Sequence, residues 1–239
     1  YTCEFFDLEE KTSDFAPRWI IERYRTEYLN QQDELVARII TSNIRAERRG
    51  MKKKGKDVNL ELPHPWSEEE LAEIESEVLA EEIRGDSTRY WDDVVVGEAI
   101  PQLVKGPLTI TDIIAWFAAT VPLEAGSIAL RHYRRRPGLA MIHPDTRARE
   151  MIEIVHFDRE AARTVGLPYP YDLGAQRQSW LIQSLTHWAG DHGWLKRNST
   201  QYRKFVYLSD VLWIRGKVTS KYIDGDGDHC VDIESSALN

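Results

Sequence analysis

The feature that most limits the fold is one long amphipathic segment followed by two segments of strand character. Residues 175–189 place four large apolar side chains at helical spacing, which predicts a long helix with one apolar side. These side chains are Trp180, Leu181, Leu185 and Trp188. Residues 211–222 instead alternate apolar and polar side chains, and residues 224–228 (DGDGD) predict a hairpin turn into a last strand. A long helix beside an antiparallel meander predicts an α+β fold in which a curved sheet wraps around a central helix.

The N-terminal part carries a hairpin pattern and one capped helix. Residues 18–29 and 34–45 are rich in β-branched and aromatic side chains, and the polar NQQD between them predicts a hairpin turn. Residues 67–84 predict a helix, because Ser67 and Glu70 have the spacing of a capping box and apolar side chains recur on one face. We expect this helix to connect two half-structures and assign it no chemistry.

The composition limits the partners and the compartment. A net charge of −8 disfavours a nucleic acid as partner. The two cysteines, Cys3 and Cys230, lie far apart and lack the spacing of a zinc site, which disfavours a disulfide framework and fits a reducing compartment. No apolar run approaches the roughly 20 residues that span a bilayer. We therefore expect a cytoplasmic protein with neither a nucleic-acid nor a membrane partner.

Three segments, in order, resemble the MaoC-type dehydratase family. The first, residues 90–119, has an aromatic-acidic start, then Val-Gly-Glu and Thr-x-Thr-Asp. The second, residues 155–177, contains His-x-Asp-x-x-x-Ala and leads to a glycine before the long helix. The third, residues 202–218, has a Ser-Asp turn before the outgoing strand. In addition, residues 1–49 are similar to the final strands of a preceding hot-dog repeat.

The resemblance implies an α+β hot-dog fold, with a curved antiparallel sheet around a central helix. It implies that residues 1–60 are the C-terminal strands of a degenerate N-terminal hot-dog repeat. Residues 61–88 would then be a linker with the capped helix, and residues 89–239 the C-terminal MaoC-like hot-dog domain. Since the chain lacks an initiator Met and ends inside a predicted strand, we expect a processed, trimmed or incomplete piece of a longer polypeptide. Hot-dog edges tend to pair, so we also expect a homo- or hetero-oligomer.

The family implies a lyase of fatty acid metabolism that hydrates a 2-enoyl thioester or dehydrates a 3-hydroxyacyl thioester. The thioester would be presented on coenzyme A or acyl carrier protein, and no cofactor is implied. Family members use an Asp five residues before the catalytic His, with an Asn between them; here these positions are Met151 and Glu153. Because of this departure, two alternatives stay open: an acyl-CoA thioesterase, and a non-catalytic acyl-binding subunit of a hetero-oligomer.

The resemblance makes His156 the best candidate for the general acid and base. The usual histidine pKa of about 6.5 lies near working pH, as such a role requires. Without the resemblance, a structural histidine would be the favoured interpretation. Glu153 is a candidate to hold the water in place of the missing Asp, with Glu150 and Asp145 as other candidates and a solvated loop carboxylate as the alternative. Asp158 is expected to cap the following helix.

Gly174 is the candidate donor to the thioester oxygen. The resemblance places it at the start of the central helix, where free backbone amides favour a developing oxyanion. A glycine chosen only for its turn conformation is the alternative. Tyr171 and Asp172 could line the substrate pocket. Arg177 could reach a phosphate, although pairing with Asp172 is the safer interpretation.

Residues 122–150 show no regular period, so we expect an irregular, arginine-rich loop there. Within it, the RHYRRRPG of residues 131–138 includes Arg134 and Arg135, which could bind the phosphates of coenzyme A. A solvated loop is the default interpretation of such a charge run.

No metal site is expected. Residues 224–228 resemble the start of a calcium loop, but the twelfth position counted from Asp224 is Ser235 rather than the required Glu. His187 and His192 lack partners at the spacing of metal ligands. A hairpin turn accounts for the aspartates.

Overall fold

The computed structural model of the chain describes residues 1–12, 18–46, 61–120 and 123–238. It forms two compact units. One comprises Tyr1–Leu60 with Arg163–Leu167, and the other comprises Glu61–Ala162 with Pro168–Asn239. The roles assigned above to residues 1–60, 61–88 and 89–239 stay predictions, and residues 47–60 lie outside the described part of the chain.

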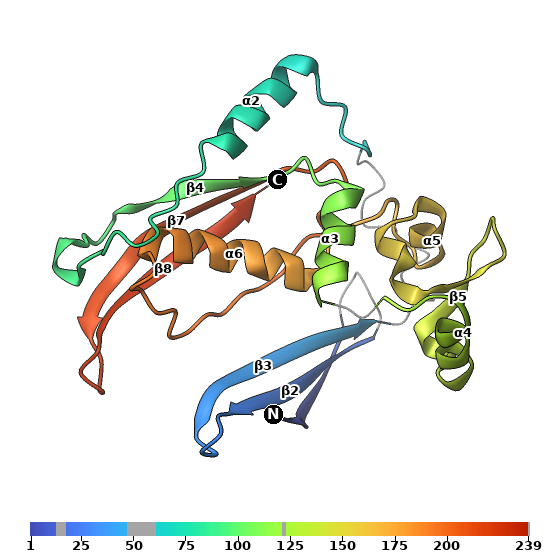
Figure 1. The fold of residues 1–239 in the computed structure, drawn as a ribbon, viewed down its shortest axis with the longest axis horizontal. Helices are drawn as coiled ribbons and strands as arrows, with labels where there is room; N and C mark the ends of the chain where they lie inside the picture. The colour runs from blue at the N-terminus through green and yellow to red at the C-terminus, as the bar shows by residue number, and fades with distance from the viewer. Residues whose placement is uncertain (13–17, 47–60, 121–122, 239) are drawn as a thin grey trace. The chain divides into compact units, whose positions relative to one another are not determined.

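The N-terminal unit contains a three-stranded antiparallel sheet in the order β1-β2-β3 (Figure 1). Its strands are β1 (Thr2–Lys11), β2 (Trp19–Leu29) and β3 (Leu35–Ala46). The predicted hairpin is confirmed, since β2 and β3 pair across residues 30–34. Arg23 and Arg25 of β2 form ion pairs with acidic side chains of β1. Tyr24 packs against the ring of Phe5 on β1, and Tyr28 packs against the ring of Tyr1, just before β1. Because successive side chains alternate between the two faces of a strand, Arg23 and Arg25 lie on one face of β2, and Tyr24 and Tyr28 lie on the other.

The C-terminal unit is built on a second antiparallel sheet, in the order β4-β7-β8. Its strands are β4 (Ala99–Lys105), β7 (Leu212–Ile223) and β8 (His229–Leu238). The alternation predicted for β7 is confirmed, because Leu212, Ile214 and Val218 are buried while the intervening side chains are more exposed. The predicted hairpin turn at residues 224–228 joins β7 to β8.

The predicted long helix is α6 (Gly174–Ala189), and it packs along one face of this sheet (Figure 1). Leu181 clusters with Leu103 of β4 and Ile214 of β7. Trp188, near the other end of α6, packs with Val218 of β7. Sheet and helix share one apolar core, which is the arrangement expected from the sequence.

The predicted capped helix is α2 (Glu68–Leu79), and its capping box is present. The Ser67 hydroxyl accepts from the Glu70 amide, and the Glu70 carboxylate accepts from the Ser67 amide. The helix ends at Leu79, however, and not at residue 84 as predicted. Arg84 instead bonds to the end of α6. Its amide donates to the His187 carbonyl, and its guanidinium donates to the Trp188 carbonyl. These bonds satisfy carbonyls at the end of α6 that have no partner within the helix.

The prediction of an irregular loop over residues 122–150 is wrong in part, because this region contains α4 (Gly126–Arg135). Ala129 and Tyr133, one helical turn apart, are buried, and the basic last turn suits the negative end of the helix. Arg134 and Arg135 therefore lie on a helix rather than a loop. The remaining elements are η1 (Trp91–Asp93), α3 (Ile110–Thr120), η2 (Pro137–Leu139), β5 (Ala140–Ile142), β6 (Arg149–Met151), η3 (Ile152–His156) and α5 (Arg159–Thr164). Of the helices in the described part of the chain, none has the length and apolar character needed to cross a membrane.

Candidate active site

His156 is the last residue of η3, a short 3-10 helix that continues directly from β6. Its ring lies 5.8 Å from the ring of Phe117, which comes from α3 and is fully buried. The start of α3 is capped by Thr109 and Asp112: the Thr109 hydroxyl accepts from the Asp112 amide, and the Asp112 carboxylate accepts from the Thr109 amide. A fixed helix thus supplies the apolar wall beside the imidazole.

The structure assigns the tautomer of His156. Its Nδ1 lies 2.8 Å from the backbone carbonyl oxygen of Tyr171. A carbonyl can only accept a hydrogen bond, so Nδ1 carries the proton and the neutral ring keeps a lone pair on Nε2. No described residue bonds to Nε2. Burial lowers the pKa of His156 against a smaller opposing effect of the Tyr171 carbonyl, so the ring is a neutral proton acceptor at neutral pH.

Glu153 lies three residues before His156 in the same 3-10 helix. Side chains at this spacing lie above one another on the same side of such a helix. Glu153 is half-buried, and within the described residues its carboxylate has no hydrogen bond or ion pair. Burial raises the pKa of Tyr133 on α4, and the charges of nearby glutamates, Glu153 among them, add to this effect. The Glu153 carboxylate is therefore near enough to Tyr133 of α4 for its charge to act on that phenol.

The other acidic candidates have different surroundings. Asp158 caps α5 as predicted, because its Oδ1 accepts from the Ala161 amide at 2.8 Å. Burial acts to raise the pKa of Asp158, but its hydrogen bonds from Ala161 and His143 outweigh burial and lower it. Met151, at the position of the family Asp, packs against the apolar core instead.

His143 is a positioning residue that the sequence did not reveal. It is buried, and its Nδ1 accepts from the amides of Asp145 and Thr146, both at 3.2 Å. Its Nε2 must therefore carry the proton, and it lies 3.0 Å from Asp158. This bond connects the β5–β6 hairpin to Asp158, which lies two residues after His156. A buried histidine in a turn has no sequence signature that would have singled it out.

The segment that accepts the bond from His156 is itself held by a buried ion pair. Arg177 donates from Nε to Asp172 Oδ2 at 2.8 Å and from Nη2 to Asp172 Oδ1 at 2.5 Å. Its Nη1 donates to the Lys204 carbonyl at 2.8 Å. Burial raises the pKa of Asp172, and the guanidinium opposes this shift. The Asp172 amide also donates to the Val206 carbonyl at 2.8 Å, so the segment is bound at both backbone and side chain.

Gly174 begins α6 and is exposed, and no side chain caps this end of the helix. Its first-turn amides are consequently available to an acceptor from outside the helix. A side-chain carbon at this position would lie 3.5 Å from the ring of Tyr202, an ordinary contact. The Tyr202 hydroxyl donates to Gln178 Oε1 at 2.6 Å, so the ring is held against the start of α6. Tyr202 is a residue of the site that was not predicted from the sequence.

One short segment, from Tyr171 to Gly174, connects the residue that bonds to the imidazole with the start of α6. The Tyr171 carbonyl that fixes His156 is three residues before Gly174, and the rings of His156 and Tyr171 lie 4.3 Å apart. Arg134 and Arg135 lie at the exposed end of α4, and within the described residues neither forms a hydrogen bond or ion pair with this segment. A shallow surface hollow lies elsewhere, between Arg215–Lys217 of β7 and Glu234–Ser236 of β8.

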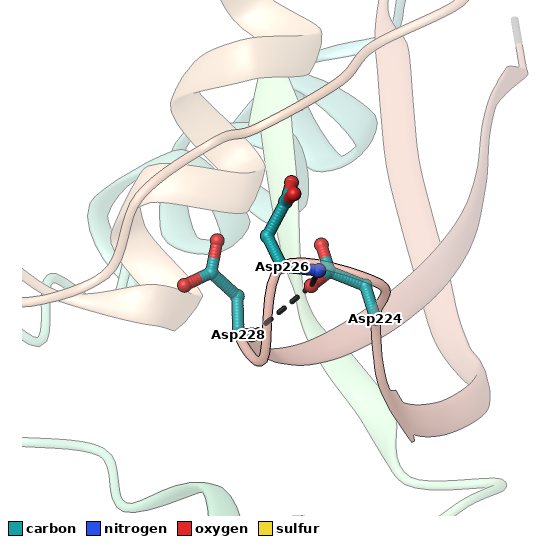
Figure 2. Close-up of side chains that lie close together, drawn as sticks. All are labelled: Asp224, Asp226 and Asp228. Carbon is teal, nitrogen blue, oxygen red and sulfur yellow. Dashed lines mark hydrogen bonds between the residues drawn. The ribbon is translucent and has the colours of Figure 1, made fainter.

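Three aspartates of the β7–β8 turn form a separate acidic cluster (Figure 2). Asp224, Asp226 and Asp228 each lie within ion-pair distance of the Lys196 ammonium group. Bonds from Lys196 and from turn amides lower the pKa of Asp224 to about 2. Asp224 also accepts from the amides of Asp226 and Asp228, the pattern of a tight turn. The three carboxylates therefore bind the Lys196 ammonium group of the same chain, and we propose no external ligand for them.

Comparisons with known proteins identify the fold through solved structures and not through the sequence. No family model matches the sequence, and no curated protein matches it significantly. Among solved structures, a MaoC-like dehydratase is 15% identical with a TM-score of 0.54, covering 99% of this chain and 68% of the other. A MaoC domain protein dehydratase from Chloroflexus aurantiacus J-10-fl is 16% identical with a TM-score of 0.51, covering 98% of this chain and 59% of the other. This chain therefore spans about three fifths to two thirds of these proteins and has the α+β hot-dog fold of MaoC-like dehydratases.

Proposed function

We propose that this chain is a MaoC-like lyase that adds water to a 2-enoyl thioester or removes it from a 3-hydroxyacyl thioester. The observation that carries the proposal is the bond from His156 Nδ1 to the Tyr171 carbonyl. It leaves a basic nitrogen beside the segment that leads into the uncapped start of α6. The likeness of the fold to dehydratases supports this reaction class.

In the hydration direction, His156 Nε2 removes a proton from water as the water oxygen bonds to Cβ. The electron pair of the double bond moves toward the thioester carbonyl, where negative charge develops on oxygen. The amide of Gly174 donates to this oxygen, with the positive end of α6 behind it. The proton held by the imidazolium then passes to Cα, so that one water is added in total. Dehydration follows the same steps in reverse.

Glu153 is proposed as the second polar group at the reacting water. It takes this role because the family Asp position, Met151, is part of the apolar core and offers no oxygen. A carboxylate on the same side of η3 as His156 can accept the second hydrogen of the water. Glu153 would orient the water, while His156 accepts the proton.

Tyr171, Asp172 and Arg177 are proposed to shape the site rather than to react. Tyr171 supplies the carbonyl and a ring surface against His156. Asp172 and Arg177 are buried and bonded to each other, so their proposed role is to hold the segment between Tyr171 and Gly174 in place. Because β4 and β8 each have one neighbour in the described sheet, we also propose edge pairing with a further hot-dog sheet.

The test is turnover of crotonyl-CoA by the purified chain. Loss of the enoyl absorbance without release of free thiol is expected for the lyase, and His156→Ala should reduce the rate at least about 100-fold. His192→Ala, which replaces an exposed histidine beyond α6, is the matched control and should leave the rate unchanged. Release of free thiol would instead support a thioesterase, and binding without either reaction would support a non-catalytic subunit. Near-normal turnover by His156→Ala would remove His156 from the proposed role.

A further inference from the structure

The surface of α4 and the adjoining β5–β6 hairpin carries a group of exposed arginines that we call the arginine surface. Its members are Arg131, Arg134, Arg135, Arg136, Arg147 and Arg149. Within the described residues none of them forms an ion pair, in contrast to Arg23, Arg25 and Arg38 of the N-terminal sheet. Three glutamates near Tyr133 of α4, Glu124, Glu150 and Glu153, offset part of this charge. The six unpaired guanidinium groups still leave a local excess of positive charge.

The arginine surface also contains exposed aliphatic side chains. Ile128 and Leu130 of α4 are 65% and 48% exposed, and Leu139 and Ile142 nearby are 36% and 41% exposed. The buried side of α4 is formed by Ala129 and Tyr133, so Ile128 and Leu130 lie on the other sides of this helix. Arginine mixed with exposed aliphatic side chains is characteristic of protein interfaces, where arginine is enriched and supplies both charge and contact area.

The arginine surface is continuous with the candidate active site. Arg149 begins β6, and β6 runs without interruption into η3, which ends at His156. Tyr133 of α4 also lies near Glu153 of η3, because the Glu153 charge contributes to the rise in the pKa of Tyr133. A macromolecule bound to the arginine surface would therefore lie beside β6 and η3, the two elements that lead to His156.

We infer that the arginine surface docks an acidic protein that carries the acyl thioester on a flexible arm. The inference rests on the proposed function and names the carrier of its substrate. An acidic protein is favoured over coenzyme A because the six guanidinium groups are exposed and spread over two elements with aliphatic side chains between them. No buried charged side chain of the described α4 and hairpin converges with them to enclose one phosphate group. Complementary charge on such a surface speeds association and sets specificity.

The test compares three crotonyl thioesters with wild type and with the double variant Arg134→Glu/Arg135→Glu. The thioesters are those of a bacterial acyl carrier protein, of coenzyme A, and of N-acetylcysteamine, which lacks both protein and nucleotide. The variant should lose at least about tenfold in kcat/KM on the carrier-protein thioester and keep its kcat/KM on the N-acetylcysteamine thioester. Arg197→Glu, which reverses an exposed arginine outside this surface, is the matched control and should leave all three values unchanged.

The result that would overturn the inference is unchanged kcat/KM on the carrier-protein thioester. A loss on the coenzyme A thioester as large as that on the carrier-protein thioester would also overturn it, because the surface would then be a nucleotide-phosphate site. Calorimetric titration with the unacylated carrier protein separates the inference from the proposed function. Binding that weakens with added salt and with the double variant, in a chain that turns over no thioester, would keep the docking surface and refute the lyase.

Discussion

Replacing Arg177 with methionine removes the cation beside a carboxylate that has no exposed surface. The side chain of Asp172 is 0% exposed and that of Arg177 is 10% exposed. Methionine preserves much of the aliphatic stem, so packing changes little while the charge disappears. Removing one partner of a buried ion pair costs about 3–5 kcal/mol, because the other charge stays buried without compensation. We therefore expect Arg177→Met to lower the free energy of unfolding by about 3–5 kcal/mol at neutral pH.

The loss should also depend on pH in a defined direction. Burial already raises the pKa of Asp172, and removal of the guanidinium, which opposes this shift, would raise it further. The folded variant then holds a proton that the unfolded chain releases above the usual pKa of 3.8. Since the unfolded state binds fewer protons over this range, stability falls as the pH rises. The deficit of Arg177→Met should be smaller at pH 5 than at pH 8.

Urea unfolding followed by tryptophan fluorescence measures both effects, since the chain contains eight tryptophans. The double variant Asp172→Leu/Arg177→Met removes both charges and should recover part of the lost stability. Arg215→Met, which replaces an exposed arginine on β7, is the control and should change stability by less than about 0.5 kcal/mol. A loss below about 1 kcal/mol for Arg177→Met, or a loss equal at the two pH values, would refute the reasoning.

Three further predictions follow from the local geometry. Because burial lowers the pKa of His156, the acid limb of kcat/KM should have its midpoint below pH 6.5, and a midpoint at or above 6.5 would contradict the assigned environment. Gly174→Ala should leave stability within about 1 kcal/mol, since the new methyl group lies 3.5 Å from the Tyr202 ring, yet lower turnover at least about tenfold by blocking close approach to the amide. Unchanged turnover would exclude that amide as a donor. Ser67→Ala should cost about 1 kcal/mol by removing the cap of α2, whereas Ser67→Asp should keep most of it; equal unfolding midpoints for all three proteins would show that the cap is unimportant.

Much of the C-terminal unit could be predicted because its signals are local. The spacing of Leu181, Leu185 and Trp188 gives the apolar side of α6, and the alternation of β7 gives its buried face. The capping boxes and the Asp158 cap depend on side chains three residues apart, which a sequence displays directly. The Asp172–Arg177 pair, expected as the safer interpretation, likewise joins residues that are only five positions apart.

The features that were missed depend on residues distant in the sequence. The sequence of residues 80–84 continues a helical pattern. In the structure, however, Arg84 lies outside the helix and donates hydrogen bonds to carbonyls at the end of α6. α4 buries only Ala129 and Tyr133, which is too narrow an apolar stripe to stand out among arginines. His143 and Tyr202 support the candidate site through Asp158 and Gly174, and neither contact could be anticipated before the chain was folded.

Hydration of crotonyl-CoA in D₂O, followed by mass spectrometry and proton NMR of the product, tests most directly whether Nε2 of His156 moves a proton between water and the acyl chain. We expect a 3-hydroxybutyryl thioester with one deuterium at Cα from the wild type, formed at least about 100-fold more slowly by His156→Ala. Crotonic acid without deuterium on its chain, or a deuterated hydroxy product formed equally fast by His156→Ala, would contradict this expectation.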